Sequence, residues 1–219
     1  NLTADGVSHR LEPASGRWGW VSAAGTGTIC ARHQADNAIH AWDTSGTPLG
    51  SLWQGSGPTG AVRFEISPDA TRLAIQEQDG NGNWSVNLFD CATQTTLSQT
   101  PAVASIGLAF APDGSLLAFS RSKEVVVLDA RTGSVRHVLE GHRTTARGLA
   151  FSPDGRSLAS VGGDRRLIVW DTFGGTPRWS VIAHALGATD VAYAPDGRTL
   201  ATIGEDGVLR LWHAELQQL

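Results

Sequence analysis

The sequence contains no methionine, a single lysine (Lys123) and only two cysteines among its 219 residues. Cys30 and Cys91 follow no metal-binding or redox spacing, so we expect two free thiols. Free thiols favour a reducing compartment and hence a cytoplasmic location. Because a chain without methionine has no start residue of its own, we expect a processed or excised piece of a longer protein. No signal-peptide pattern is present at the N-terminus.

Long apolar runs and excess charge are also missing. No apolar stretch approaches the roughly 18–20 residues that a transmembrane helix needs, so we expect a soluble domain with no membrane partner. The formal net charge is −4 and the isoelectric point is about 5.9, which argues against nucleic acid as the main partner. Glycine is abundant at 26 residues, and 41% of the chain is hydrophobic. This composition suits one all-β domain with many turns and a sizeable core.

The stretch from Leu149 to Asp171 contains three short strand-like segments joined by two turns. Ser152–Gly155 reads Ser-Pro-Asp-Gly, in which proline presets the first corner and glycine accepts the left-handed conformation that closes a hairpin. Residues 158–161 and 167–170 follow as apolar strands around a Gly-Gly-Asp turn. The stretch therefore predicts an antiparallel meander.

Copies of this stretch recur along the chain. The aspartates of the turns are 44, 41 and 42 residues apart, and the residue pairs that end the third strands are 47, 39, 42 and 42 apart. The other turns are Ser67–Ala70, Ala111–Gly114 and Ala194–Gly197, and the pairs are Trp42-Asp43, Phe89-Asp90, Leu128-Asp129, Trp170-Asp171 and Trp212-His213. Self-similarity near 42 residues, with about four short strands per unit, is typical of a propeller blade.

On these motifs the chain resembles the WD-repeat (WD40-type) family of β-propellers. The likeness covers essentially the whole chain, most strongly residues 141–213 and least residues 14–60. It implies an all-β propeller of about five four-stranded antiparallel blades, at about residues 18–54, 61–99, 105–140, 147–182 and 189–213. Because seven blades are usual in the family, an arc cut from a larger ring is the alternative.

The resemblance also implies how such a ring would close. Residues 6–12 are similar to residues 133–140, which stand where the outer, fourth strand of a blade belongs. The C-terminus, in contrast, ends shortly after the third strand that contains Trp212. We therefore expect residues 1–13 to supply a strand that pairs beside residues 207–213 and completes the last blade. The alternative is a disordered tail with a chance likeness.

His142, Ser160 and Asp164 suggest the catalytic triad of a hydrolase. The same spacings, 18 and 4 residues, recur at His184, and each set is followed six residues later by a tryptophan. Two nucleophile sites in one small domain are implausible, and the resemblance implies structural hydrogen-bonded tetrads instead. The two sets are His142, Ser160, Asp164 and Trp170, and His184, Thr202, Asp206 and Trp212. The first blade retains only Asp36 and Trp42, and the second and third blades lack the set.

Other constellations predict no catalytic, cofactor or metal site. Residues 79–83 resemble the start of a calcium loop, but Trp84 stands where that loop needs glycine and Asp90 where it needs glutamate. A plain hairpin turn is the preferred interpretation. The seven histidines show no close metal spacing, so we expect tetrad members and surface residues.

The surface is therefore where function is expected. The resemblance implies a non-catalytic scaffold that binds a protein or peptide through the loops leading into each blade and joining its second and third strands. Candidate partner-binding residues on those loops are Arg63, Ile106, Thr145, Arg147, Thr189 and Asp190. Tryptophans outside the core position are Trp53, Trp84 and Trp179, and each is either an interface anchor or part of the packing between blades.

Two further function classes stay open. The resemblance also allows a sensor or regulatory domain of a larger ATPase, kinase or protease. A propeller enzyme or lectin would need a polar or aromatic pocket, which the sequence does not locate. The partner and the oligomeric state are not specified by the sequence.

Overall fold

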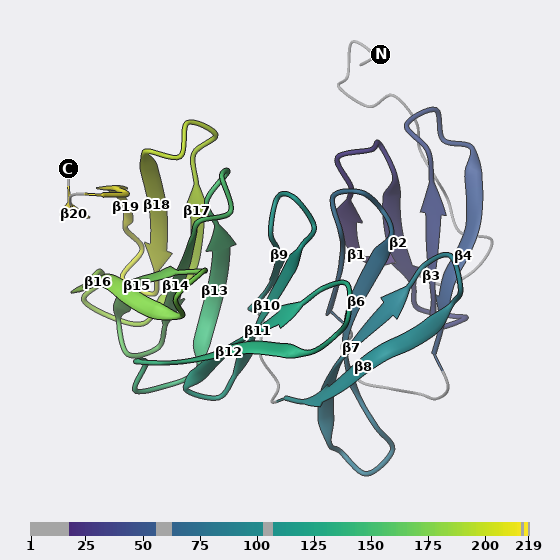
Figure 1. Ribbon diagram of the computed structural model, residues 1–219, viewed down its shortest axis with the longest axis horizontal. Coiled ribbons are helices and arrows are strands. Elements are labelled where there is room, and N and C mark those ends of the chain that lie inside the picture. Colours follow the sequence, from purple (N-terminus) through teal and green to yellow (C-terminus); the bar gives the residue numbers. More distant parts are fainter. Residues whose placement is uncertain (1–17, 56–62, 103–106, 216, 219) are drawn as a thin grey trace.

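The computed structural model describes residues 18–55, 63–102, 107–215 and 217–218. These residues form five antiparallel sheets of four strands each, and the chain is all-β as predicted. Figure 1 shows the sheets following one another along an arc, with β1–β4 at one end and β17–β20 at the other. Within each sheet the strands pair in sequence order, so every sheet is a meander.

The strand bounds follow the repeat. The first sheet contains β1 (Trp18–Ala23), β2 (Ile29–His33), β3 (Ala38–Trp42) and β4 (Pro48–Gln54). The second contains β5 (Arg63–Ile66), β6 (Arg72–Gln78), β7 (Trp84–Asp90) and β8 (Thr95–Pro101). The third contains β9 (Leu108–Phe110), β10 (Leu116–Arg121), β11 (Glu124–Asp129) and β12 (Val135–Glu140). The fourth contains β13 (Ala146–Phe151), β14 (Ser157–Gly162), β15 (Arg166–Asp171) and β16 (Thr176–Ile182). The fifth contains β17 (Ala188–Tyr193), β18 (Thr199–Gly204), β19 (Leu209–His213) and β20 (Gln217–Gln218).

The turns between first and second strands are closed by one repeated contact. In the second to fifth sheets the aspartate carboxylate accepts the backbone N–H two residues later, at 2.8–3.1 Å. The residue that directly follows this aspartate is in the left-handed region, with φ of 70° at Gly155 and 59° at Ala70. Glycine reaches this region without strain, whereas a Cβ atom makes it unfavourable. Ala70 is thus the one strained copy among these four turns.

A second aspartate organises the turns that follow the third strands. Asp171 Oδ1 accepts the backbone N–H groups of Phe173 and Gly174 at 2.8 and 3.2 Å. The equivalent carboxylates of the first three sheets accept backbone N–H groups in the same way. In the fifth sheet His213 replaces the aspartate, and its Nδ1 accepts the N–H of Glu215 at 3.4 Å. The pair that ends each third strand therefore shapes the turn into the outer strand.

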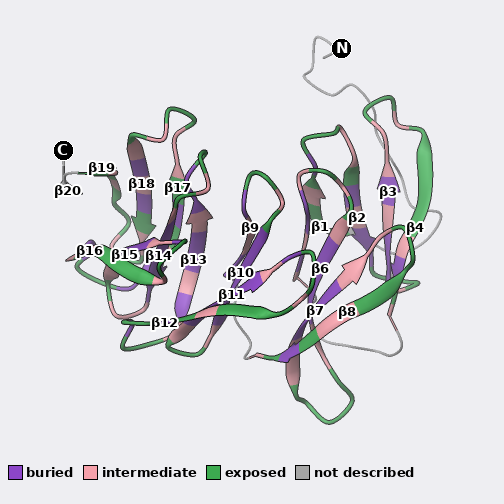
Figure 2. Ribbon diagram, in the orientation of Figure 1, coloured by how far each residue is buried: buried purple, intermediate pink, exposed green. Residues whose placement is uncertain are grey.

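The hydrophobic core lies between consecutive sheets. Four clusters of buried residues fill the four interfaces, and Figure 2 shows buried residues concentrated on the inner strands and exposed ones on the outer strands. The first strands contact each other in turn, β1 with β5, β5 with β9, β9 with β13 and β13 with β17. No comparable contact joins β17 to β1 within the described ranges. Each inner sheet is therefore covered on both faces, and each end sheet on one.

The uncovered face of the fifth sheet is apolar. Ile203, Leu209 and Leu211 are 44%, 62% and 49% exposed. Their counterparts 42 residues earlier, among them Leu167 and Val169, are at most 1% exposed because they pack against the fifth sheet. The fourth and fifth sheets therefore have the same apolar packing surface, and in the fifth sheet no described residue covers it.

The predicted closure of the ring stays a prediction. Residues 1–13, which we expected beside residues 207–213, lie outside the described ranges. The expectation that the chain has no fourth strand after Trp212 is wrong, because Gln218 and Gln217 pair with Trp212 and His213. The two-residue length of β20 explains why the sequence pattern did not reveal it.

Two further expectations can be compared with the structure. Cys30 is buried and Cys91 half-buried, and both are free thiols as predicted. Burial raises the pKa of Cys30 to about 12 and that of Cys91 to about 11, so both stay protonated at neutral pH. Among the described residues no helix has the length and apolar character that crossing a membrane requires.

We predict that Ala70→Gly stabilises the protein. The substitution relieves the left-handed alanine, and the net gain after the added freedom of glycine in the unfolded chain should be about 0.5–1 kcal/mol. The matched control is Gly155→Ala, where an added Cβ meets no atom within 4 Å and acts on the backbone alone. Chemical denaturation should show opposite shifts, and a loss of stability in Ala70→Gly would contradict the strain at this turn.

We also predict that Leu211→Ser leaves the free energy of unfolding within about 0.5 kcal/mol of the wild type, because this side chain faces solvent. Val169→Ser, its counterpart in the fourth sheet, should cost about 2–4 kcal/mol because it opens a packed interface. Urea unfolding of both variants measures the difference. Equal losses would mean that the face of the fifth sheet is covered in solution and that the ring closes.

Candidate functional site

The fourth sheet contains a connected hydrogen-bond network built by the first predicted set. Trp170 Nε1 donates to Ser160 Oγ at 2.8 Å, and Ser160 Oγ lies 2.8 Å from His142 Nε2. His142 Nδ1 lies 3.0 Å from Asp164 Oδ1. Asp164 also accepts the backbone N–H of Arg143 at 2.7 Å. The network thus joins the segment leading into β13 to β14, to β15 and to the turn between them.

The protonation of this network is set by burial. Burial lowers the pKa of His142 although Asp164 opposes the shift, so the imidazole is neutral at pH 7. The Nδ1–H then donates to Asp164, and Nε2 accepts from the Ser160 hydroxyl. Burial alone would raise the pKa of Asp164, but the Arg143 N–H and His142 hold it below its usual value. Every polar side-chain atom of this hydrogen-bond network, from the Trp170 indole to the Asp164 carboxylate, therefore has a partner.

The same geometry argues against a nucleophilic serine. Ser160 is fully buried, and its Oγ is already engaged by the imidazole and by the Trp170 indole. A substrate carbonyl could reach this oxygen only after the sheet opened. The set has the composition of a catalytic triad, and its position inside the packed sheet gives it a fastening role.

The fifth sheet repeats the network with threonine in place of serine. His184 Nε2 and Trp212 Nε1 both lie 2.9 Å from Thr202 Oγ1, and His184 Nδ1 lies 2.9 Å from Asp206. Arg210 adds an ion pair to Asp206 at 2.8 Å. Although burial favours the protonated acid, the Ala185 N–H, His184 and Arg210 hold the pKa of Asp206 well below its usual range.

The other three sheets lack the complete network. Ile75 and Phe119 occupy the hydroxyl position in the second and third sheets, and both are fully buried. They share their core clusters with Phe89 and Leu128, which take the tryptophan position. These two sheets rely on packing at this position. In the first sheet Ala31 stands at the hydroxyl position, opposite His40.

The segments that lead into β13 and β17 lie at the same end of the sheets as the turns after β14 and β18. We call this end the loop face. Arg147 on β13 pairs with Glu205 in the turn after β18, so this ion pair links the loop faces of the fourth and fifth sheets. Thr145 is half-buried beside Arg147. Thr189 Oγ1 donates to the carbonyl of Ile203 at 3.2 Å. The loop face of these sheets is thus tied together by side chains.

The remaining candidate partner-binding residues differ in position and in exposure. Asp190 is exposed and Arg63 half-buried at the loop-face ends of their strands, whereas Ile106 lies outside the described residues. Trp84 is half-buried where β7 begins. The expectation of an exposed anchor is wrong for Trp53, which is buried and packs edge-on against Phe89 with ring centroids 6.4 Å apart.

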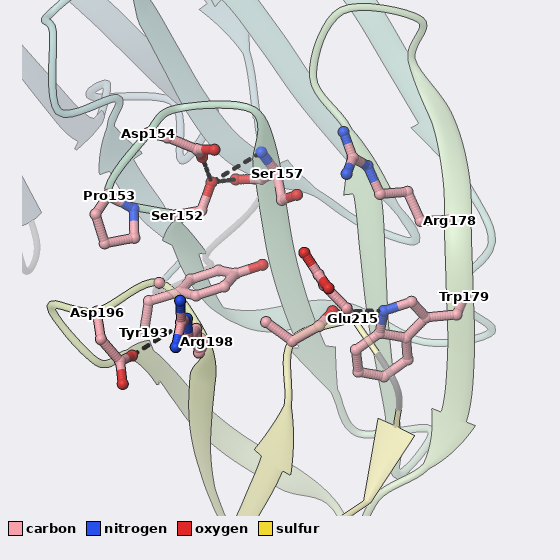
Figure 3. A pocket seen from close by; sticks show the side chains of 12 residues that line it. Ser152, Pro153, Asp154, Ser157, Arg178, Trp179, Tyr193, Asp196, Arg198 and Glu215 are labelled. Atoms are coloured by element: carbon pink, nitrogen blue, oxygen red, sulfur yellow. Dashed lines mark hydrogen bonds between the residues drawn. The ribbon is translucent and has the colours of Figure 1, made fainter.

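Trp179 does not belong to the loop face. It lines a pocket of about 560 Å³ between the fourth and fifth sheets, at the opposite end from the loop face (Figure 3). Its indole donates to the Ala214 carbonyl at 2.9 Å and so fastens β16 to the segment after β19. Burial raises the pKa of Tyr193, in the same pocket, to about 12. Both acidic and basic side chains line the pocket, with Arg178, Asp196 and Glu215 among them.

Sequence reasoning missed one cluster. His33, Asp36 and His40 each place a potential ligand atom within 4.8 Å of the others, so the expectation that the histidines show no close spacing is wrong here. The signal was available as His-x2-Asp-x3-His across a predicted hairpin. The resemblance to a calcium loop, in contrast, is a plain turn, because Asp79 accepts the backbone N–H groups of Asn81 and Asn83.

We predict that the tetrad hydroxyls contribute to stability. Thr202→Val keeps the side-chain volume but leaves His184 Nε2 and Trp212 Nε1 without their partner, and should cost about 1–3 kcal/mol. Ser160→Ala should cost a similar amount for the same reason. Ser180→Ala, at an exposed hydroxyl on β16, is the control and should stay within about 0.5 kcal/mol of the wild type. Thermal and urea unfolding measure the three values, and tetrad variants as stable as the control would contradict the fastening role.

Comparisons with known proteins agree with this geometry. Residues 133–171 and 175–213 match the family model described as "WD domain, G-beta repeat". The chain is 33% identical over 160 residues to the WD repeat-containing protein SL1-17 of Schistosoma mansoni, covering 73% of this chain and 50% of that protein. It is 33% identical over 128 residues to an uncharacterized WD repeat-containing protein of Synechocystis, covering 57% and 36% respectively. It thus spans half of the first relative and about a third of the second.

A structural likeness points to the same fold. A chain in the crystal structure of a mitotic checkpoint complex superposes with a TM-score of 0.71 and 22% identity, covering 90% of this chain and 62% of that one. This likeness shows the fold alone. The family follows from the matched repeats and from the WD repeat-containing relatives: the chain belongs to the WD-repeat family.

Proposed function

We propose that the chain is a non-catalytic scaffold that binds a protein or a peptide on its loop face. WD-repeat proteins generally serve as protein-interaction scaffolds, and this coarser role comes with the family. What supports the loop face in particular is the ion pair between Arg147 and Glu205. It joins two sheets at the end where the tetrads fix the loops.

A rigid loop face favours binding for a physical reason. Loops that are already ordered lose little conformational entropy when a partner docks. Asp164 and Asp206 hold the backbone N–H groups of Arg143 and Ala185, which lie on the segments leading into neighbouring sheets. These segments therefore present their exposed side chains in a fixed relation, as functional loops on a rigid scaffold do.

The absence of catalysis is part of the proposal. The hydroxyl and imidazole groups that would form a triad are buried and saturated by hydrogen bonds. The formal charge of −4 supports a protein or peptide rather than nucleic acid as partner. The free thiols of Cys30 and Cys91 support a cytoplasmic location.

A second candidate is a sensor or regulatory domain within a larger protein. The observation that favours it is the apolar, exposed face of the fifth sheet around Leu209 and Leu211, a surface that further structure would cover. One relative, 36% identical over 110 residues, is named WD repeat and SOCS box-containing protein 1 of Homo sapiens and so combines WD repeats with another module. A catalytic domain in the reading frame around these residues would support this role.

The loop-face proposal is tested by exchanging the charges of its inter-sheet ion pair. Arg147→Glu combined with Glu205→Arg keeps an attractive pair between the two sheets while it inverts the surface charge that a partner meets. We expect the immobilised wild type to retain a specific protein from a cell extract, identified by mass spectrometry. The double variant should bind that purified protein at least about tenfold more weakly, as expected for a loss of 1.4 kcal/mol.

Two controls separate binding from stability. The double variant should unfold at the wild-type temperature, because the ion pair persists. Asp196→Ala alters a turn at the opposite end of the fifth sheet and should bind like the wild type. Unchanged binding by the double variant, or equal losses in both variants, would contradict the loop face as the docking surface.

A further inference from the structure

The hairpin of β2 and β3 brings two histidines to one face of the first sheet. His33 ends β2 and pairs with Ala38 on β3, and His40 lies two residues beyond Ala38. Because side chains alternate along a strand, Ala38 and His40 point to the same face, and His33 shares it through the cross-strand pair. The rings are 6.2 Å apart between centroids.

Asp36 lies between the two rings. Its Oδ2 is 3.0 Å from His33 Nδ1 and 3.0 Å from His40 Nε2. The other oxygen, Oδ1, accepts the backbone N–H of Ala38 at 3.0 Å, which fixes the carboxylate so that Oδ2 faces both imidazoles. The site thus consists of two ring nitrogens around one oriented oxygen, supported by a hydrogen bond from outside the cluster.

The cluster is open to solvent. The side chain of Asp36 is 45% exposed, that of His40 is 29% exposed and that of His33 is 10% exposed. An ion can reach the cluster from solvent and can keep water as an additional ligand.

We propose that His33, Asp36 and His40 bind a divalent first-row transition ion, with Zn²⁺ as the best fit. Imidazole nitrogens with one carboxylate favour Zn²⁺ and its neighbours over Mg²⁺ or Ca²⁺, which prefer oxygen ligands. Bonds of about 2.0–2.1 Å place tetrahedral ligand atoms roughly 3.3 Å apart, close to the two nitrogen–oxygen separations in this cluster. An ion held by these three side chains would take water as its further ligand, as open zinc sites do.

The position of the cluster gives the site a role beyond that of a scaffold loop. Asp36 precedes Trp42 by six residues, as Asp164 precedes Trp170 and Asp206 precedes Trp212. In the fourth and fifth sheets that aspartate holds a histidine from the segment leading into the sheet. In the first sheet it meets two histidines of its own hairpin, and a bound ion would staple β2 to β3 at the loop face.

The test is metal titration of the full chain without an affinity tag, after treatment with a chelator. Isothermal titration with ZnCl2 should give one site per chain, and CoCl2 should give the visible bands of a low-coordinate cobalt site. His40→Ala and Asp36→Asn should each weaken Zn²⁺ binding by more than about tenfold, since even outer-shell partners contribute that much.

His213→Ala is the matched control, because it removes a histidine from the opposite end of the arc and should leave binding unchanged. Circular dichroism of each variant shows whether the sheets persist, and Asp36→Asn preserves the size of the side chain should His40→Ala fail to fold. The proposal is overturned if the wild type shows no stoichiometric site, or if folded His40→Ala and Asp36→Asn both bind Zn²⁺ as tightly as the wild type.

Discussion

Face-to-face packing between consecutive sheets supports this structure, because a single four-stranded meander has two apolar faces and cannot bury either one alone. Each interface is filled by residues from both neighbours, and the inner sheets are therefore buried on both sides. The consequence is local stability. A sheet depends on the sheets before and after it, and distant parts of the arc affect it only through them. The end sheets are necessarily the least supported.

Hydrogen-bond networks are added to this packing where the sequence supplies polar groups. The fourth and fifth sheets place a buried imidazole and an indole around one hydroxyl, so polar groups that would be costly to bury satisfy each other. In the second and third sheets the buried apolar residues Ile75 and Phe119 occupy the position of the hydroxyl. Both solutions fill the volume, and the network also reaches the segments that lead into the fourth and fifth sheets, through Arg143 and Ala185.

The repeat made much of this fold predictable from sequence. Turn residues and the paired ends of third strands mark each sheet, and the recurrence of His184 with the spacing of His142 separates a structural set from a catalytic one. Three features escaped it. β20 has two residues and no pattern. Trp53 is buried because of Phe89, a residue of the next sheet that local sequence does not reveal. The cluster around Asp36 depends on which face of a hairpin each histidine occupies.

The positions that do not follow the repeat distinguish this chain from a generic array of WD repeats. The two ends of the arc show this most clearly, since they differ in chemistry. The fifth sheet ends in an apolar face around Leu209 and Leu211, which can be covered only by another apolar surface. The first sheet presents His40 and Trp42, with ring centroids 6.1 Å apart, beside an ionised carboxylate. An apolar face that packed directly on this one would have to bury the Asp36 carboxylate and its two imidazoles, which costs free energy unless these groups stay paired with one another. The contacts of Asp36 with His33 and His40 therefore set a condition for any surface that covers the first sheet.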